Sequence, residues 1–410
     1  MSTKTLDIYL EARKTLNANA HPFGVWASQE NQDNYKRIWA RDLAVTALAS
    51  IADKNYPLLE ACSTGLILLS RSANEFGQIP SNISIDDKGN IINVSFGGPV
   101  GRTDTGFWWA IATLNALEHI QNQELSDILK PQIIKIFKLA DCWEFNGKHL
   151  MYLPLSSNWA DEYATQGYVL YDQLLRVWAL ELASTCFGEN IYLEKAQKIR
   201  ISIKYHFLNE DIECDYPLIS NEKRQHFGPF CSSFTPGEIV TTFDAWSVAL
   251  LLTLNIPSLV KRNWLIEQIS MLFVETNEQG IPAFWPILNA KDKAYDTLLS
   301  NYSFAFKNRP GHFHNGGIWP VVNGFVIAAL ESRNAFELAN KLRITLEAQL
   351  IANHEEYPFP EYIGVYDNQA NGIKNLSFSA SGLIIAKKEN SASFLSLTHN
   401  GKKEISTKSS

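Results

Sequence analysis

The chain has 410 residues, of which 46% are hydrophobic and 19% charged, a composition typical of a globular protein with a large core. Its net charge of −7 argues against nucleic acid or an anionic membrane surface as the main partner. The start of the chain has no apolar segment typical of a signal peptide, and no run of about 18 apolar residues is present to span a membrane. The five cysteines are odd in number and lack the Cys-x-x-Cys spacing of many zinc sites. We therefore expect reduced thiols and a cytoplasmic protein.

Helical periodicity dominates the chain, with apolar residues at i, i+3, i+4 and i+7 spacing in twelve segments. Strand signals are few, and one β-hairpin is expected at Asn82–Phe96, with its turn at Asp86–Gly89. We expect a single domain over residues 1–390 and a polar C-terminal tail over residues 391–410. The predicted helices are Leu6–Leu16, Trp39–Ile51, Tyr56–Glu75, Asp104–Ile120, Glu124–Cys142, Val169–Thr185, Ile191–His206, Thr241–Thr253, Ile256–Val274, Gly316–Glu331, Ala335–Ala352 and Ser377–Lys387.

The connections between these helices alternate in length. Links that leave the even-numbered helices can be short, as at Ala52–Asn55 and Ser332–Asn334, whereas links that lead into them are mostly long. Twelve helices paired as six hairpins would close into an all-α (α/α)6 toroid with the even-numbered helices inside. Two unrelated helical domains are the alternative, but no linker rich in Pro, Gly or Ser divides the chain.

Most of the inner helices are preceded by a segment rich in aromatic, charged and amide side chains. Aromatic residues make up 12% of the chain, and many of them belong to cores. Aromatic faces beside carboxylates and amides also hold sugars, because the ring packs on the C–H face while the hydroxyls form hydrogen bonds. In a toroid these distant segments would converge on one mouth. They are Asn34–Asp42, Gly101–Trp109, Ser156–Tyr163, His314–Pro320 and Phe359–Gly364.

The last of these segments holds one carboxylate, Glu361, between prolines and aromatic residues. Pro358 and Pro360 keep the backbone extended and remove two donors, so Glu361 is presented from a stiff segment. A stiff carboxylate with aromatic walls suits the activation of water in a glycosidase, which needs a second carboxylate elsewhere.

The upstream acids each have a structural alternative. Asp42 and Asp104 could cap helices, because free N–H groups and the helix dipole favour a carboxylate there. Arg41 could form an ion pair with Asp42, or the two could bind sugar hydroxyls together.

Asp161 and Glu162 could belong to a solvated loop. Their place between Trp159 and Tyr163 instead favours a recessed acid whose pKa is raised by desolvation. His312 and His314 lie two residues apart without a nearby Cys or Asp, which is weak evidence for a metal site. We expect no metal. His314 and Asn315 are expected to bind hydroxyl groups.

The motif segments resemble, in the same order, those of six-hairpin glycosidases. The resemblance is closest to the neutral/alkaline invertases of glycoside hydrolase family 100, with family 63 glucosidases and glycogen-debranching glucosidases as more distant relatives. It covers roughly residues 30–365. Asn34–Asp42 is similar to NYDQVFVRD, Gly101–Trp109 to a shortened GRVAPVDSGLWW, His314–Pro320 to HNGGSWP, and Pro360–Tyr362 to the start of PEYYDG.

The resemblance implies an inverting hydrolase without a cofactor, acting on a short saccharide or small glycoside that is α-glucosidic or sucrose-like. Glu361 would be the general base. The general acid of related families lies on the loop before the sixth helix, which matches Asp161, although Asp104 has the better-matching motif. We expect Asp161 as the acid and Asp104 as a hydroxyl ligand. The other expected substrate-binding residues are Tyr35, Trp39, Arg41, Asp42, Trp108, Trp159, Glu162, Gln166, His314, Asn315, Trp319 and Tyr362.

The chain also departs from the invertase pattern. Lys36 and Arg37 replace an Asp-Gln pair, and Ala164–Tyr168 stands where invertases have Gly-His-Pro-Leu-Glu, so sucrose specificity does not carry over. Two other functions stay open: a sugar 2-epimerase or isomerase with His314 as acid or base, and a non-catalytic saccharide-binding protein. The sequence leaves the sugar, the linkage and the formation of a homo-oligomer undecided.

Overall fold

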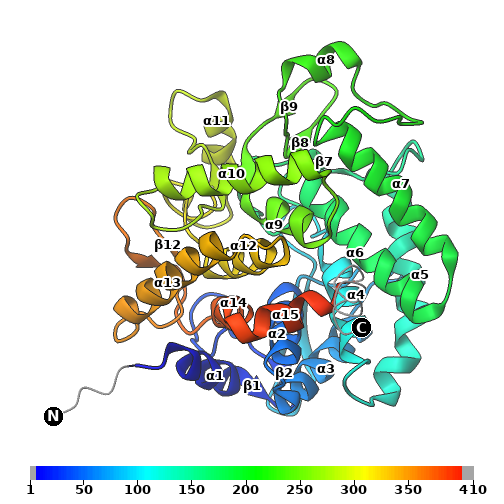
Figure 1. The fold of residues 1–410 in the computed structure, drawn as a ribbon. Coiled ribbons are helices and arrows are strands. Elements are labelled where there is room, and N and C mark those ends of the chain that lie inside the picture. The colour runs from blue at the N-terminus through cyan, green and yellow to red at the C-terminus, as the bar shows by residue number, and fades with distance from the viewer. Residues whose placement is uncertain (1–5, 399–410) are drawn as a thin grey trace, which may run out of the picture.

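Six helices form a closed inner ring in the computed structural model, which describes residues 6–398. Each inner helix contacts the next one around the ring, and the last contacts the first. In Figure 1 these helices surround the centre, and the outer helices lie around them. The predicted all-α (α/α)6 toroid is therefore confirmed. The inner helices are α2 (Ala40–Ala52), α4 (Thr105–Ala116), α6 (Leu170–Phe187), α9 (Ala245–Thr253), α12 (Pro320–Ser332) and α14 (Ser377–Ala386). The outer helices are α1 (Ile8–Asn19), α3 (Tyr56–Arg71), α5 (Gln123–Cys142), α7 (Asn190–His206), α10 (Leu259–Glu275) and α13 (Phe336–Asn353).

The inner and outer helices differ in how their sides are covered. Every residue of α4, α9 and α14 is buried, as expected for helices that are apolar all round. The outer helix α5 instead buries one stripe that includes Leu125, Leu129 and Ile133. The inner helices are therefore enclosed on all sides, and the segments that precede them lie around the axis of the ring.

Large aromatic side chains fill the ring's axis, and we call them the aromatic plug: Trp108, Trp178, Trp246, Phe325 and Phe394. Neighbouring rings are close, with centroids 5.7 Å apart for Trp108 and Trp246 and 5.2 Å apart for Phe325 and Phe394. The five side chains are almost completely buried. The plug therefore fills the interior of the toroid.

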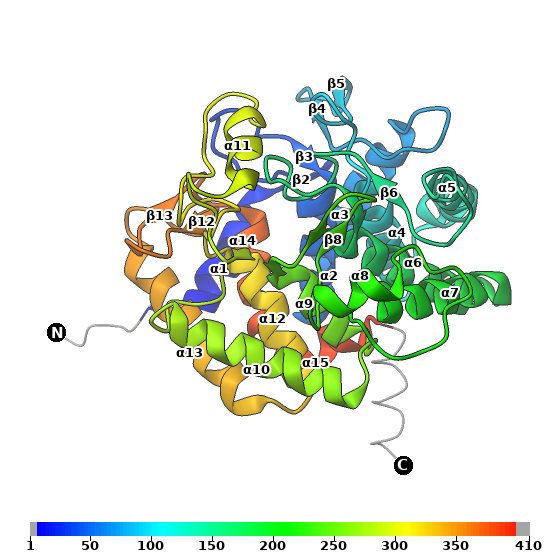
Figure 2. The same cartoon turned by 90° about the horizontal axis from the view of Figure 1, so that it is seen from above.

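The helix α15 (Lys388–Ser396) corrects the prediction of a tail that begins at residue 391. It contacts α12 and α2, because Phe394 inserts between Phe325 and Trp178. Figure 2 places α15 at the opposite end of the ring from α11 (Lys293–Ser300) and the strands β4 and β5. The remainder of the predicted tail, residues 399–410, lies outside the described residues.

Short antiparallel strands hold the segments that lead into the inner helices. The predicted hairpin is confirmed as β4 (Asn82–Ile85) and β5 (Ile91–Ser95). The other strands and the short helix α8 (Asn221–His226) were not predicted, because elements of two to six residues carry little periodicity. The strands pair as β3 (Ile38–Trp39) with β4, β1 (Ala20–His21) with β2 (Gly24–Val25), β10 (Phe243–Asp244) with β11 (Phe284–Trp285), and β12 (Tyr362–Ile363) with β13 (Ala370–Asn371). A four-stranded sheet has the order β6 (Tyr152–Leu153), β7 (Gly167–Val169), β8 (Ser233–Phe234) and β9 (Ile239–Val240).

Across residues 6–398, no helix has the combination of length and apolar character that crossing a membrane requires.

Candidate active site

A cavity opens at the end of the ring where the inner helices begin. Its volume is about 80 Å³, which is room for roughly three waters. Its floor rests on the aromatic plug, because Trp159 packs edge-on against Trp246 with ring centroids 4.9 Å apart. Four of the five motif segments reach it. The lining residues are Tyr35, Trp39, Arg41, Asp42, Trp159, Asp161, Phe313, His314, Trp319, Glu361, Leu376 and Phe378.

Glu361 is buried in the cavity wall, with 4% of its surface exposed. The Tyr35 hydroxyl donates a hydrogen bond of 2.5 Å to its Oε1. The preceding residue is anchored as well, because Ser379 Oγ donates to the Pro360 carbonyl at 2.6 Å. Burial raises the pKa of Glu361 above its ordinary value, while the nearby Lys307 charge and the Tyr35 hydrogen bond act in the opposite direction. The carboxyl is thus held in a fixed orientation and away from bulk water.

Gly372 makes room for this carboxyl, because the pairing of β12 with β13 brings it alongside Glu361. Its φ is +81°, and a Cβ there would lie 2.2 Å from Glu361 Oε2. We expect Gly372→Ala to displace the carboxylate and to lower kcat about 100-fold, the effect of a misplacement near 1 Å. Measured kcat and thermal unfolding of the purified variant check this.

Gly147→Ala is the matched control for this prediction. Gly147 has a φ of +67°, and within the described chain nothing lies within 4 Å of the position that its Cβ would take. Both variants carry the strain of a left-handed alanine, about 1–3 kcal/mol, but only Gly372→Ala disturbs Glu361. Equal kcat values for the two variants would contradict the conclusion that Gly372 leaves the space needed by the Glu361 carboxylate.

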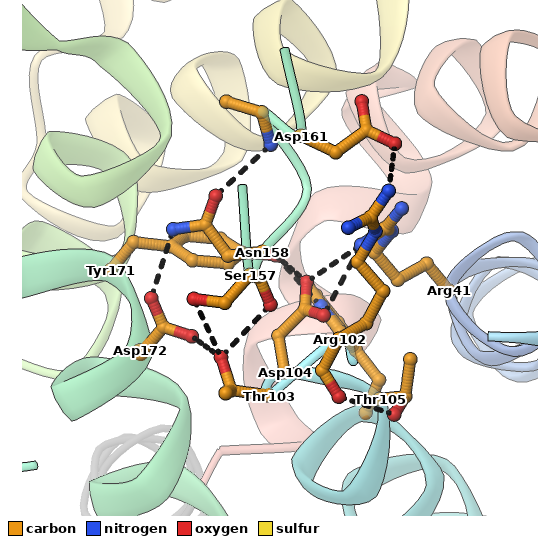
Figure 3. Close-up of polar contacts among 12 residues, drawn as sticks. Arg41, Arg102, Thr103, Asp104, Thr105, Ser157, Asn158, Asp161, Tyr171 and Asp172 are labelled. Atoms are coloured by element: carbon orange, nitrogen blue, oxygen red, sulfur yellow. Dashed lines mark hydrogen bonds and ion pairs between the residues drawn. The ribbon is translucent and has the colours of Figure 1, made fainter. Parts of the chain in front are cut away.

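Asp161 lies at the rim of the cavity in an ion pair with Arg102. Arg102 Nη2 is 2.7 Å from Asp161 Oδ2, and the Asp161 side chain is 25% exposed (Figure 3). Arg102 itself is buried and donates to the carbonyl oxygens of Val100 and Ser156. The predicted apolar surroundings of Asp161 are therefore wrong, because a guanidinium held by backbone carbonyls faces this carboxylate.

Asp104 lies behind the cavity wall rather than in it. It is completely buried, and both of its oxygens are 3.1 Å from Arg41 Nη1 (Figure 3). Its expected contact with substrate is therefore wrong. Asp104 does occupy the N-cap position of α4, as the alternative expected, but among the described residues its side chain forms no capping hydrogen bond. Asp104 instead neutralises and orients Arg41, which lines the cavity.

Asp42 faces the cavity from the first turn of α2. Of the two alternatives for Arg41 and Asp42, the ion pair between them is not formed, because Arg41 pairs with Asp104. Asp42 does not cap its helix, whose N-cap residue is Trp39. Burial raises the pKa of Asp42 to about 7, and the charge of Glu361 adds to this shift while Arg41 opposes it. This carboxyl is free to bind a polar ligand.

His314 presents an unpaired imidazole to the cavity. Its ring is stacked on Trp319 at 5.1 Å and lies edge-on to Trp159 at 5.0 Å. Within residues 6–398 neither ring nitrogen has a hydrogen-bond partner, although both are buried. Burial lowers the pKa of His314 to about 3, so the ring is neutral and offers one donor and one acceptor. Such a group suits a ligand hydroxyl.

The described residues contain no group of three or more His, Cys, Asp or Glu side chains that could hold a metal ion.

Five further predicted substrate ligands do not line the cavity. Trp108 belongs to the aromatic plug, and its Nε1 donates to Tyr171. Glu162 points to an outer loop, where it accepts a hydrogen bond from the Ser303 N–H. Gln166 is exposed on the surface. Asn315 bonds to the backbone of Leu288 and Asn308, and Tyr362 stacks behind Trp319 at 6.0 Å. These contacts are structural.

The sequence interpretation missed the three apolar lining residues Phe313, Leu376 and Phe378. Phe313 directly precedes the His314 motif, so its position could have drawn attention to it. Leu376 and Phe378 lie at the start of α14, and only the three-dimensional arrangement brings them to the cavity. Arg102 stood within a recognised motif, but its partner Asp161 is distant in sequence.

No protein-family model matches the chain, and no curated protein sequence matches it. Solved structures do share its fold. The GH63 mannosylglycerate hydrolase from Thermus thermophilus, in complex with Tris and D-glycerate, matches with a TM-score of 0.67 and 13% identity over 92% of this chain and 99% of that one. A rhamnosidase from Klebsiella oxytoca with rhamnose bound has a TM-score of 0.58 and 12% identity over 93% of this chain and 64% of its own. An α-amylase from Clostridium perfringens has a TM-score of 0.52 and 12% identity over 95% of this chain and 100% of its own. These matches show a six-hairpin glycosidase fold, and the closeness to family 100 invertases stays a prediction.

Proposed function

We propose that this protein is an inverting glycoside hydrolase that cleaves a small glycoside at its terminal sugar. The observation that carries the proposal is the pair of carboxyls facing one cavity in different surroundings. Glu361 is buried and fixed by Tyr35, whereas Asp161 stands at the rim beside Arg102. Carboxyl pairs in unlike environments supply the acid and the base of glycosidases.

In this scheme water attacks the anomeric carbon directly. Glu361, ionised, takes a proton from the water, while Asp161 gives a proton to the leaving glycosidic oxygen on the opposite face of the sugar. No hydrogen bond within the described residues involves Asp161 Oδ1, so this oxygen can face the leaving glycosidic oxygen. The C–O bond to the leaving group breaks as the bond to water forms. The base then holds one proton, and the acid is left ionised.

The walls of the cavity support a sugar as its occupant, and its small size limits that occupant. A volume of about 80 Å³, which corresponds to roughly three waters, leaves no room for more than one sugar ring. Trp159, Trp319 and Phe313 supply aromatic faces, while Arg41, Asp42 and His314 supply polar atoms for hydroxyl groups. No cofactor is needed for this reaction.

The unusual state of His314 does not favour the epimerase alternative. An acid or base catalyst works best when its pKa lies near the working pH, and the pKa of His314 is lowered to about 3. A neutral imidazole can orient a hydroxyl group but does not shuttle protons efficiently near pH 7.

The test is a panel of glycosides with the product anomer followed by NMR. It contains sucrose, trehalose, maltose, isomaltose and glucosylglycerate, together with mannosylglycerate and a rhamnoside, because structural neighbours are named for such substrates. We expect hydrolysis of at least one glycoside with inversion. Retention of the anomeric configuration would reject the single displacement. Isomerisation of free sugars without any hydrolysis would reject the function.

A further inference from the structure

A third carboxyl, outside the cavity, joins the two segments that carry Arg102 and Asp161. Asp172 lies in the first turn of α6 and is completely buried. Its Oδ1 is 2.9 Å from Thr103 Oγ1, and its Oδ2 accepts a hydrogen bond of 3.0 Å from Asn158 Nδ2 (Figure 3). Thr103 follows Arg102 directly, and Asn158 lies three residues before Asp161.

The hydrogen bonds around Thr103 indicate which atom holds the proton. Thr103 Oγ1 also lies 3.0 Å from the Ser157 carbonyl oxygen and 3.5 Å from Ser157 Oγ. The carbonyl can only accept, and it already accepts the Thr103 N–H. If Asp172 were ionised, Thr103 would donate to it, and Thr103 Oγ1 would face the Ser157 carbonyl with no proton between the two oxygens. A proton on Asp172 Oδ1 removes this contact between acceptors, because Asp172 then donates to Thr103 and Thr103 donates to Ser157.

The charged groups around Asp172 agree with a neutral carboxyl. Asp104 faces it from the start of α4 and carries the negative charge of this cluster, since Arg41 of α2 pairs with it. The pKa of Asp172 is raised to about 8 by burial and then by the charge of Asp104. The hydrogen bonds from Asn158 and Thr103, and its own backbone N–H, act in the opposite direction.

Asn158 links Asp172 to the segment that holds Asp161 at the rim of the cavity. Asn158 Oδ1 accepts a hydrogen bond of 3.1 Å from the N–H of Ala160, which directly precedes Asp161. On the other side, the Thr103 N–H donates to the Ser157 carbonyl at 2.6 Å. Asp172 therefore ties the segment of Asp161 to the segment of Arg102 through one side chain on each.

We propose that Asp172 is a positioning residue, whose neutral carboxyl holds Asp161 against Arg102 in the geometry needed for proton donation. The part of this proposal that concerns proton donation rests on the proposed glycosidase function. It predicts that an amide can replace the carboxyl, because the Asn side chain can donate to Thr103 and accept from Asn158.

The first test compares Asp172→Asn with Asp172→Leu, and uses Asp127→Asn on the exposed face of α5 as control. We expect kcat of Asp172→Asn to stay within about threefold of the wild type. Asp172→Leu should lose about 100-fold in kcat on a glycoside whose leaving group needs a proton, and far less on the corresponding glycosyl fluoride. Equal losses of Asp172→Asn and Asp172→Leu, or equal losses on both substrates, would overturn the positioning role.

The second test does not depend on any activity. It measures the thermal unfolding midpoint of the wild type and of Asp172→Asn between pH 5 and 9. A carboxyl whose pKa is raised in the folded protein stabilises the fold fully at a pH below its pKa in the unfolded chain, about 4. This stabilisation is lost as the pH rises from that value to the pKa in the folded protein. The midpoint of Asp172→Asn relative to the wild type should therefore rise from pH 5 to about 8 and then level off.

If the difference between the unfolding midpoints of Asp172→Asn and the wild type stayed constant from pH 5 to 9, the proposal that Asp172 is neutral would be rejected. A rising difference in a protein that cleaves none of the glycosides would reject the glycosidase function and the positioning role, and would leave the protonation of Asp172 established. The two failures are thus distinguishable.

Discussion

Glu361→Gln is expected to lower kcat by about 10²–10⁴-fold on every substrate that the protein cleaves. The amide keeps its oxygen for the Tyr35 hydroxyl, which donates to Glu361 Oε1 at 2.5 Å in the wild type. It cannot take a proton from water. Because the loss concerns the nucleophile rather than the leaving group, glycosyl fluorides should be affected as strongly as ordinary glycosides. Steady-state kinetics on both substrate types measure this.

Glu356→Gln is a suitable control for this variant, because Glu356 is an exposed carboxylate five residues earlier in the chain. Thermal unfolding should show that Glu361→Gln is at least as stable as the wild type, since the buried position no longer holds an ionisable group. A folded Glu361→Gln protein with near-full hydrolysis would remove Glu361 as the base. Saccharide binding that never leads to turnover in the wild type would indicate a non-catalytic protein.

Asp161→Asn is expected to have the second largest effect, and the effect should depend on the leaving group. We expect kcat to fall by about 10²–10⁴-fold on glycosides with an alcohol leaving group, because the protonated oxygen departs far more easily. On a glycosyl fluoride the fall should be small, since fluoride leaves with little help from an acid. The ratio of the two losses, measured with the sugar that the panel identifies, is the decisive quantity.

The Asn side chain can still accept the hydrogen bond that Arg102 Nη2 donates to Asp161 at 2.7 Å. A general loss of structure is therefore not expected, and circular dichroism of Asp161→Asn should match the wild type. Equal losses on the glycoside and the fluoride would show that Asp161 orients the substrate or supports the fold. In that case Asp42, which faces the same cavity, would be the next candidate for the acid.

The toroid could be predicted from the sequence because its outer helices, such as α5, carry one apolar stripe, and its inner helices, such as α4, form continuous apolar segments between polar ones. The helix α15 could not, since Lys388–Ser396 is polar apart from a few positions and its stability comes from Phe394 inside the aromatic plug. The short strands likewise owe their existence to pairing across the chain, as between β7 and β8. Local pattern carries no information about such distant partners.

The candidate site was predictable at the level of segments but not of side chains. The motifs located the cavity, yet Asp104 and Trp108 do not line it, because Asp104, at the N-cap of α4, pairs with Arg41, and Trp108, within α4, packs against Trp246. Which side of a helix start faces a ligand depends on how the helix is rotated in the ring. Likewise, the contact of Arg102 with Asp161 joins segments about 60 residues apart, a pairing that neither segment reveals by itself.

The aromatic plug and α15 close one end of the ring, so within the described residues the cavity is covered on that side. In the proposed reaction the sugar occupies the inner part and the leaving alcohol the outer part, which requires the alcohol to depart first. The freed sugar then leaves an otherwise empty enzyme. Kinetically, that sugar should be a competitive inhibitor and the alcohol a noncompetitive one. In the proposed reaction, a cavity covered on its inner side would also restrict attack on longer saccharides to the last unit of a chain.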